Sequence, residues 1–104
     1  MFGLDANIVK ELTSIFANHK KVDKVILYGS RAKGTFRSGS DVDLTLVGKD
    51  VNLKTVYAIS DEIEELFLPY RFDISVFEYL DNPDLVEHIR RVGKVFYQRK
   101  GLST

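Results

Sequence analysis

The chain contains no cysteine, which excludes a disulfide framework, a thiolate nucleophile and a thiolate-bound metal. Long apolar runs are also missing, since the longest are only a few residues and a membrane helix needs roughly 20. The first residues, MFGLDANIVKEL, lack the basic start and apolar centre of a signal peptide. We therefore expect a cytoplasmic protein without a membrane segment.

Neither sign of charge is in excess, because 15 basic residues balance 15 acidic ones. A net charge of zero argues against a general nucleic-acid binder. The charges are nevertheless unevenly placed, with residues 19–37 mostly basic and residues 41–73 mostly acidic. This change of sign would suit a site that holds both a polyanion and a cation, although ordinary solvated surface charge is the simpler explanation.

The length of 104 residues predicts a single domain over 1–104, since this is near the commonest domain size. Hydrophobic periodicity predicts helices at about 5–17, 53–67 and 83–92, and strands at 25–28, 41–47, 71–77 and 94–99. A short helical turn is expected after Gly29, stopped by Gly34. This alternation favours an α/β or α+β domain in which helices pack against a small mixed sheet.

The predicted helix at 53–67 begins after Asn52, a good N-cap, and ends before Pro69. Its inward stripe is expected to consist of Val56, Ile59, Ile63, Leu66 and Phe67. The predicted helix at 83–92 begins at Asn82-Pro83 and ends at Gly93.

Two carboxylates, Asp41 and Asp43, alternate with buried-type residues in the strand at 41–47. Because residues i and i+2 of a strand share a face, the two project together, about 7 Å apart at roughly 3.3 Å per residue. Asp73 has the same phase in the strand at 71–77. If these strands pair, three carboxylates converge on one spot.

Three clustered carboxylates repel one another unless a cation neutralises them, and Mg²⁺ prefers oxygen ligands of this kind. No other residues offer a competing ligand set. His19 and His88 are isolated in the sequence, and we expect each to be solvated or packed without a role as a ligand.

The segment from Gly29 to Lys33 predicts a phosphate site. A strand that enters a glycine turn at the start of a helix presents free backbone N–H groups, which bind phosphate oxygens. Ser30 adds a hydroxyl donor, and Gly29 allows close approach. Arg31, Lys33 and Arg37 are candidates to neutralise the phosphate charge.

The combination of Gly29-Ser30, then Asp41 and Asp43, and Asp73 on a later strand resembles the signature of nucleotidyltransferases related to DNA polymerase beta. The stretch GSRAKGTFRSGSDVDL is similar to that of the smallest members, the minimal nucleotidyltransferases or MNT proteins. The resemblance covers nearly the whole chain, including PYRFDISVF and EHIRRVGKVFYQR, and implies the palm-like fold of that superfamily. Tyr28 stands where many relatives have phenylalanine.

The resemblance also implies an activity and its residues. Family members bind a nucleoside triphosphate and two Mg²⁺ ions, and they transfer a nucleoside monophosphate with release of pyrophosphate. The resemblance implies that the site residues bind the triphosphate (Gly29 and Ser30, with Arg31 and Lys33) and coordinate the metals (Asp41, Asp43 and Asp73). It further implies that Asp73 accepts the proton of the attacking hydroxyl.

The partner implied by the resemblance is a HEPN-domain toxin. Minimal members are commonly encoded beside such a protein, and some attach AMP from ATP to one of its tyrosines and so act as antitoxins. A homo- or hetero-oligomer would be compatible with this, and nucleic acid is not an expected partner. Two alternatives stay open: a binding module that neutralises the toxin by contact alone, and a small-molecule adenylyltransferase.

Overall fold

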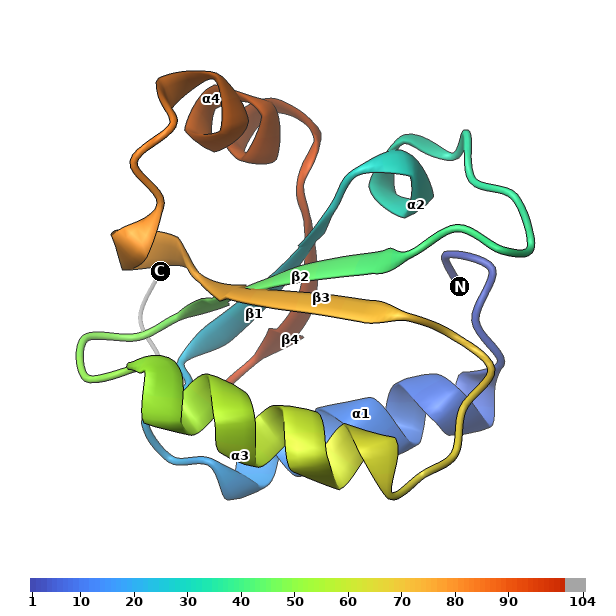
Figure 1. Cartoon of the computed structure of the whole chain (residues 1–104), viewed down its shortest axis with the longest axis horizontal. Helices are drawn as coiled ribbons and strands as arrows, with labels where there is room; N and C mark the ends of the chain where they lie inside the picture. Colours follow the sequence, from blue (N-terminus) through green and yellow to red (C-terminus); the bar gives the residue numbers. More distant parts are fainter. Residues whose placement is uncertain (101–104) are drawn as a thin grey trace.

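The computed structural model describes residues 1–100 and has the α/β architecture predicted from the sequence. Four helices, four strands and a 3₁₀ turn follow one another along this part of the chain (Figure 1). In order they are α1 (Ala6–Asn18), β1 (Lys24–Tyr28), α2 (Ser30–Lys33), β2 (Val42–Val47), α3 (Leu53–Glu64), β3 (Phe72–Val76), η1 (Phe77–Tyr79), α4 (Pro83–Val92) and β4 (Lys94–Gln98).

The sheet has the strand order β3-β2-β1-β4 and is mixed, as expected. β1 pairs antiparallel with both β2 and β4, whereas β2 pairs parallel with β3. A parallel pair cannot be joined by a tight turn, and the helix α3 provides the crossover between β2 and β3. The sheet thereby places the predicted acidic strands, β2 and β3, side by side.

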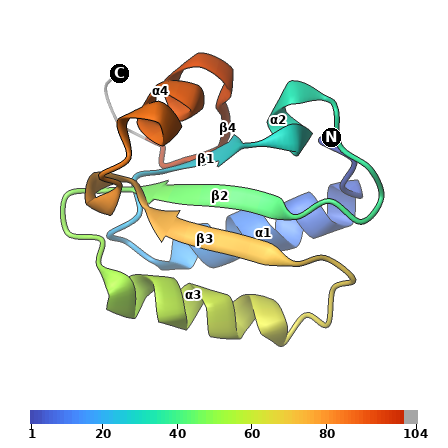
Figure 2. The same ribbon diagram turned by 45° about the horizontal axis from the view of Figure 1, so that its top comes forward.

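The two faces of the sheet are covered differently. α1 and α3 lie together on one face, while α2 and α4 lie on the other (Figures 1 and 2). The alternation of apolar residues explains the choice of core face, since Val42, Leu44 and Leu46 of β2 are fully buried on the side of α1 and α3. The residues between them therefore face α2 and α4.

The longer helices begin where the sequence predicts. Asp5 caps α1, and Asn82 caps α4 ahead of a first-turn proline. Asn52 caps α3 by a reciprocal pair of hydrogen bonds with Thr55, which satisfies two otherwise free donors. None of the helices among residues 1–100 combines the length and the apolar character needed to cross a membrane.

The end of α3 differs from the prediction. The helix stops at Glu64 and not at residue 67, and Phe67 adopts a left-handed conformation with φ of 52°. Its side chain is 92% exposed, so its expected place in the inward stripe was wrong. The chain must leave the helix at this point to reach β3, and the turn carries Phe67 away from the core.

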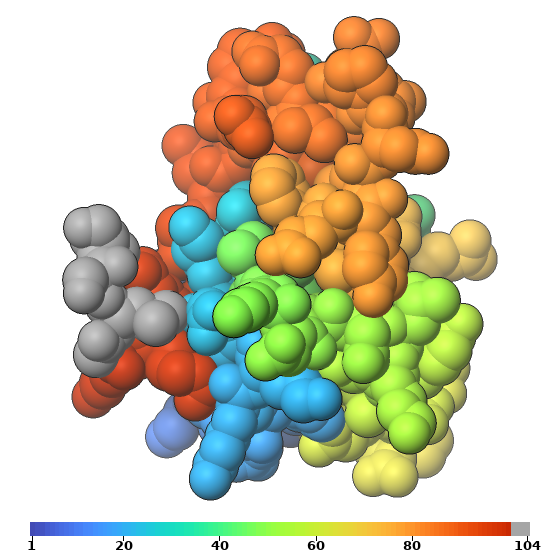
Figure 3. Space-filling view, turned by 90° about the vertical axis from the view of Figure 1, so that its left-hand side faces the viewer, coloured from blue at the N-terminus to red at the C-terminus, as the bar shows by residue number. Residues whose placement is uncertain are grey.

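α4 and η1 form a raised part of the molecule on the α2 side of the sheet. Figure 3 shows their residues (orange) above the segments around residues 20 (light blue) and 50 (green). Ile89 anchors α4 and is 2% exposed. Gly93 allows close contact with the sheet, because a Cβ there would lie 2.7 Å from Cγ2 of Ile26.

Candidate nucleotide site on the α4 face of the sheet

Pairing of the strands aligns three side chains in a row across the sheet. Tyr28 of β1 is opposite Asp43 of β2, and Asp43 is in turn opposite Asp73 of β3. All three lie on the face away from the main core, because they alternate with the buried residues of their strands. The structure therefore brings Asp73 next to Asp43, although thirty residues separate them in the chain.

The surroundings of Asp43 raise its pKa above the ordinary value. Burial is the largest cause, followed by the negative charges of Asp73 and Asp41, while His88 acts in the opposite direction. Asp41 itself is exposed and comes immediately before β2. Asp43 is thus the central carboxylate of the three, and its ionised form is the one that a bound cation would stabilise.

A second row of polar side chains lies beside the first and ties β2 to β3. Thr45 is fully buried, and the Ser75 hydroxyl donates a hydrogen bond of 2.9 Å to its Oγ1. Thr45 and Ser75 occupy the next positions on the face that carries Asp43 and Asp73. This contact fixes the register of the two strands and with it the placement of the two aspartates.

The carboxylates suit Mg²⁺ that arrives with a phosphate ligand. Within residues 1–100, no three histidine or acidic side chains are arranged to hold a metal by themselves. Mg²⁺ does not require such a cage, since it is usually bound by one or two carboxylates together with waters and substrate phosphates. Asp43 with a neighbouring aspartate supplies that number of ligands.

Gly29 forms the turn between β1 and α2 and touches the acidic row. Its φ of 75° and ψ of −157° fall in a region that essentially only glycine adopts. A Cβ at this position would lie 2.3 Å from Oδ2 of Asp43. Ser30 follows as the first residue of α2, so the predicted phosphate turn and the carboxylates are adjacent in space.

We expect Gly29→Ala to destabilise the protein more than Gly34→Ala. Both glycines have positive φ, but a Cβ at Gly34 meets no atom within 4 Å, so only backbone strain of roughly 1 kcal/mol applies there. At Gly29 the clash with Asp43 should add at least about 1 kcal/mol. Urea unfolding measures both, and the loss caused by Gly29→Ala should be smaller in an Asp43→Ala background than in the wild type, because the clash is gone while the backbone strain at Gly29 remains. Equal losses at the two glycines would contradict this contact.

Arg31 follows the predicted phosphate turn, but its guanidinium is bound by backbone oxygens of other segments. Its guanidinium is buried and donates hydrogen bonds to the backbone oxygens of Ser40 and Phe2. It also stacks on Phe36 and Tyr70, at 5.1 Å from each ring centre. These contacts hold the N-terminal segment and the loop before β2 in place, and the phosphate contact expected of Arg31 finds no support in this arrangement.

Arg31→Met should lower the free energy of unfolding by about 2–4 kcal/mol, because the buried guanidinium and its hydrogen bonds to two partly buried carbonyl oxygens are lost. Lys33→Met is the matched control, since Lys33 is exposed and a surface change of this kind costs less than about 0.5 kcal/mol. Urea unfolding of both variants tests the assignment. Normal stability with lost nucleotide binding in Arg31→Met would instead restore a phosphate role.

The structure adds two residues that sequence analysis did not assign to the site. Tyr28 is buried. Burial raises its pKa, as do the charges of Asp73 and Asp43, while a hydrogen bond with Ser75 lowers the pKa in part. His88 of α4 lies edge-on to the Tyr28 ring, with ring centres 6.4 Å apart. Its Nε2 accepts a hydrogen bond of 3.3 Å from the Gly29 backbone N–H.

His19 and His88 differ in the structure, although we expected both to be solvated or packed without a role as ligands. His19 pairs with Glu62 on the opposite side of the molecule, which agrees with a surface role. His88 is packed, as expected, but it is packed into the candidate site. The signal in the sequence was its position in α4, on the inward stripe with Leu85 and Ile89.

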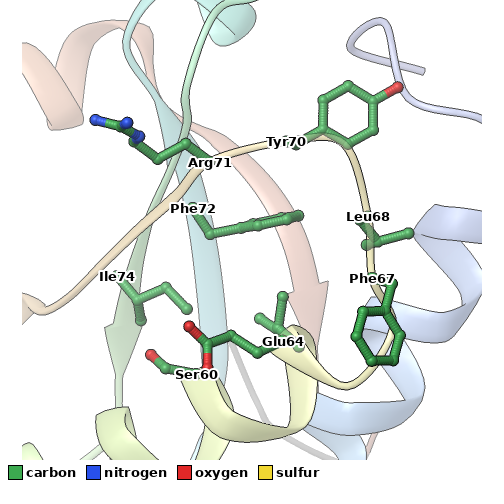
Figure 4. Close-up of a pocket in the computed structure, with 9 residues that line it drawn as sticks. Ser60, Glu64, Phe67, Leu68, Tyr70, Arg71, Phe72 and Ile74 are labelled. Atoms are coloured by element: carbon green, nitrogen blue, oxygen red, sulfur yellow. The ribbon is translucent and has the colours of Figure 1, made fainter.

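A cavity of about 660 Å³ lies away from this site, between the end of α3 and β3. Figure 4 shows the Phe72 ring and Ile74 facing Ser60 and Glu64 of the helix. Phe72 and Ile74 belong to the core face of β3, opposite to Asp73. The cavity is therefore separate from the row of carboxylates.

Comparisons with known proteins bear on the fold and the family. No curated protein matches the sequence. A toxin–antitoxin complex solved with AMP-PNP is similar in structure, with a TM-score of 0.69 and 17% identity over 93% of this chain and 76% of the other. A tri-AMPylated Shewanella oneidensis HEPN toxin in complex with an MNT antitoxin gives a TM-score of 0.66 and 11% identity, over 90% and 72%.

At these identities the structural matches show a shared fold. The family is shown by sequence, since the model described as polymerase beta, nucleotidyltransferase matches residues 10–101. The resemblance carried by Gly29-Ser30 and the aspartates is confirmed at this level, and the chain belongs to the polymerase beta nucleotidyltransferase family.

Proposed function

We propose that the protein is a Mg²⁺-dependent nucleotidyltransferase that moves AMP from ATP to a hydroxyl group of a protein partner. The observation that carries the proposal is the alignment of Asp43 with Asp73 beside the Gly29 turn. The Gly29 turn suits a triphosphate, and the aspartates suit the cation that accompanies it. Membership of the nucleotidyltransferase family supports the reaction class.

In the proposed reaction, the acceptor oxygen attacks the α-phosphorus of ATP, the bond to the β-phosphate oxygen breaks, and pyrophosphate leaves. Gly29 and Ser30 bind the phosphates through backbone N–H and hydroxyl donors. Asp73 accepts the proton of the acceptor hydroxyl. Asp43 with Asp41 and the phosphates would hold Mg²⁺, which would supply positive charge to stabilise the attacking and leaving oxygens.

The proposed partner is a HEPN-domain toxin, for which this protein would act as the antitoxin. Support comes from the similar structures, which include a HEPN toxin that carries AMP and is bound to an MNT antitoxin. A protein substrate could reach the site from solvent, since Asp41 and Asp73 are exposed and Asp43 is only partly buried.

Incubation with α-³²P-labelled ATP and Mg²⁺, with and without a HEPN-domain protein as the proposed partner, tests the proposal. Label on the HEPN protein would support AMP transfer. Neutralisation of the toxin without label, and equally by Asp43→Asn, would favour a binding module that acts by contact. Label that appears only on small molecules would favour a small-molecule adenylyltransferase.

A further inference from the structure

The Gly29 N–H is the first backbone donor of the proposed phosphate turn, and in this structure it already has an acceptor. His88 lies fifty-nine residues further along the chain, and its Nε2 accepts the hydrogen bond at 3.3 Å. An accepting Nε2 carries no proton, so the neutral ring holds its proton on Nδ1. A residue from α4 thus occupies a donor that a phosphate oxygen would use.

The position of the ring places it at the centre of the site. It contacts the Tyr28 ring edge-on, and it is close enough to Asp43 to act on the pKa of that carboxyl. The ring therefore lies among the three groups that define the site: the phosphate turn, the central carboxylate and Tyr28. Simple packing of α4 on the sheet does not require this contact, because Ile89 provides the buried anchor of the helix.

The bond from Gly29 to His88 has the character of an exchangeable contact. At 3.3 Å it is longer than the usual 2.9–3.0 Å of an N–H···O bond, and both residues are only partly buried. A phosphate oxygen is charged, and charge-assisted hydrogen bonds are about twice as strong as neutral ones. A phosphate would therefore replace the imidazole at this donor.

We infer that His88 is a displaceable acceptor that occupies the position of a phosphate oxygen at the Gly29 N–H. Binding of the triphosphate moves the Gly29 N–H from His88 to a phosphate oxygen, and rotation of the imidazole is sufficient to release it. This inference rests on the proposed function, because it assumes that Gly29 binds phosphate. If it holds, the apparent Kd for the triphosphate equals the intrinsic Kd divided by the fraction of molecules in which the Gly29 N–H is free.

His88→Phe provides the test, because it keeps a ring against Tyr28 and removes the acceptor. We expect it to bind Mg²⁺-ATP about 3- to 10-fold more tightly than the wild-type protein in calorimetry, as the competing state is lost. His88→Gln retains an acceptor and should stay within about twofold of the wild type. His19→Phe changes the histidine paired with Glu62 and serves as the control for altering an aromatic side chain elsewhere.

Unchanged or weaker ATP binding by a folded His88→Phe protein, beside measurable binding by the wild type, would overturn the inference and leave the proposed function standing. Absence of ATP binding in both proteins would remove the proposed function together with the inference. If His88→Phe does not fold, His88→Ala takes its place with the same expected tightening. Circular dichroism establishes which variant is folded before calorimetry.

Discussion

Asp43→Asn is expected to abolish nucleotidyl transfer and, at the same time, to make the ligand-free protein more stable. Asp43 is the central member of the row, with Asp73 beside it on β3 and the Gly29 turn against its carboxylate. Asparagine keeps the shape and removes the negative charge. Loss of preorganised charge at such a position typically costs at least about 10²–10³-fold in rate, so turnover should fall to background.

The gain in stability follows from the raised pKa of Asp43. Burial and the charges of Asp73 and Asp41 make the ionised carboxylate less favourable in the folded state than in the unfolded state. The folded protein therefore binds the proton more tightly, and the free energy of unfolding falls as pH rises from the ordinary aspartate pKa through the raised one. Asp43→Asn removes this loss of stability at higher pH.

Two measurements check the prediction. Transfer from labelled ATP should be lost, while urea unfolding at neutral pH should show a gain on the order of 0.5–1 kcal/mol. The difference in free energy of unfolding between Asp43→Asn and the wild type should grow as pH rises from the ordinary aspartate pKa through the raised pKa of Asp43, and then become constant. A folded variant with full activity would remove Asp43 from the site, and a strongly destabilised variant would assign it a structural role in β2.

Asp73→Asn is expected to slow transfer by about 10²–10⁴-fold while leaving ATP affinity nearly unchanged, which is the loss typical of a missing general base. Asp73 lies at the outer end of the row and is exposed, whereas the phosphate turn contacts Asp43. Binding of the triphosphate therefore keeps its main contacts in the variant. The step that suffers is activation of the acceptor hydroxyl.

Calorimetry with Mg²⁺-ATP and single-turnover transfer on the same preparation separate binding from chemistry. Asp61→Asn is the matched control, because Asp61 is an exposed aspartate of α3 on the opposite side of the sheet. An alternative surface ion pair of Asp73 with Arg71 is not formed among residues 1–100. An unchanged transfer rate in Asp73→Asn would exclude this carboxylate from the reaction.

Much of the arrangement could be predicted because it depends on local patterns. Alternation of apolar and polar residues gave both the strands and their buried faces, and the same phase put Asp43 and Asp73 on one surface. Asn52 and Pro83 marked the starts of their helices through hydrogen bonding that involves only near neighbours. Pairing of the two acidic strands had to be assumed, and neither its parallel sense nor the strand order β3-β2-β1-β4 could be predicted.

The remaining features depend on contacts between distant segments. Arg31 carries a full charge and follows a phosphate-type turn, yet carbonyl groups of other loops bind its guanidinium. His88 belongs to an amphipathic helix, but only the docking of α4 reveals that its ring reaches Gly29. Phe67 continues the helical periodicity of α3, and the path of the chain toward β3 overrides that pattern.

The parallel pairing of β2 with β3 also bears on the order in which the molecule folds. β1, α2 and β2 follow one another directly, so the phosphate turn and Asp43 can meet through short-range contacts. We expect the contacts of Asp73 and His88 with the site to form later, because contacts between distant segments require closure of longer loops. We therefore expect a partly folded or newly synthesised chain to bind phosphate weakly but to lack the base needed for transfer. The protein would then become catalytically active only once folding is complete.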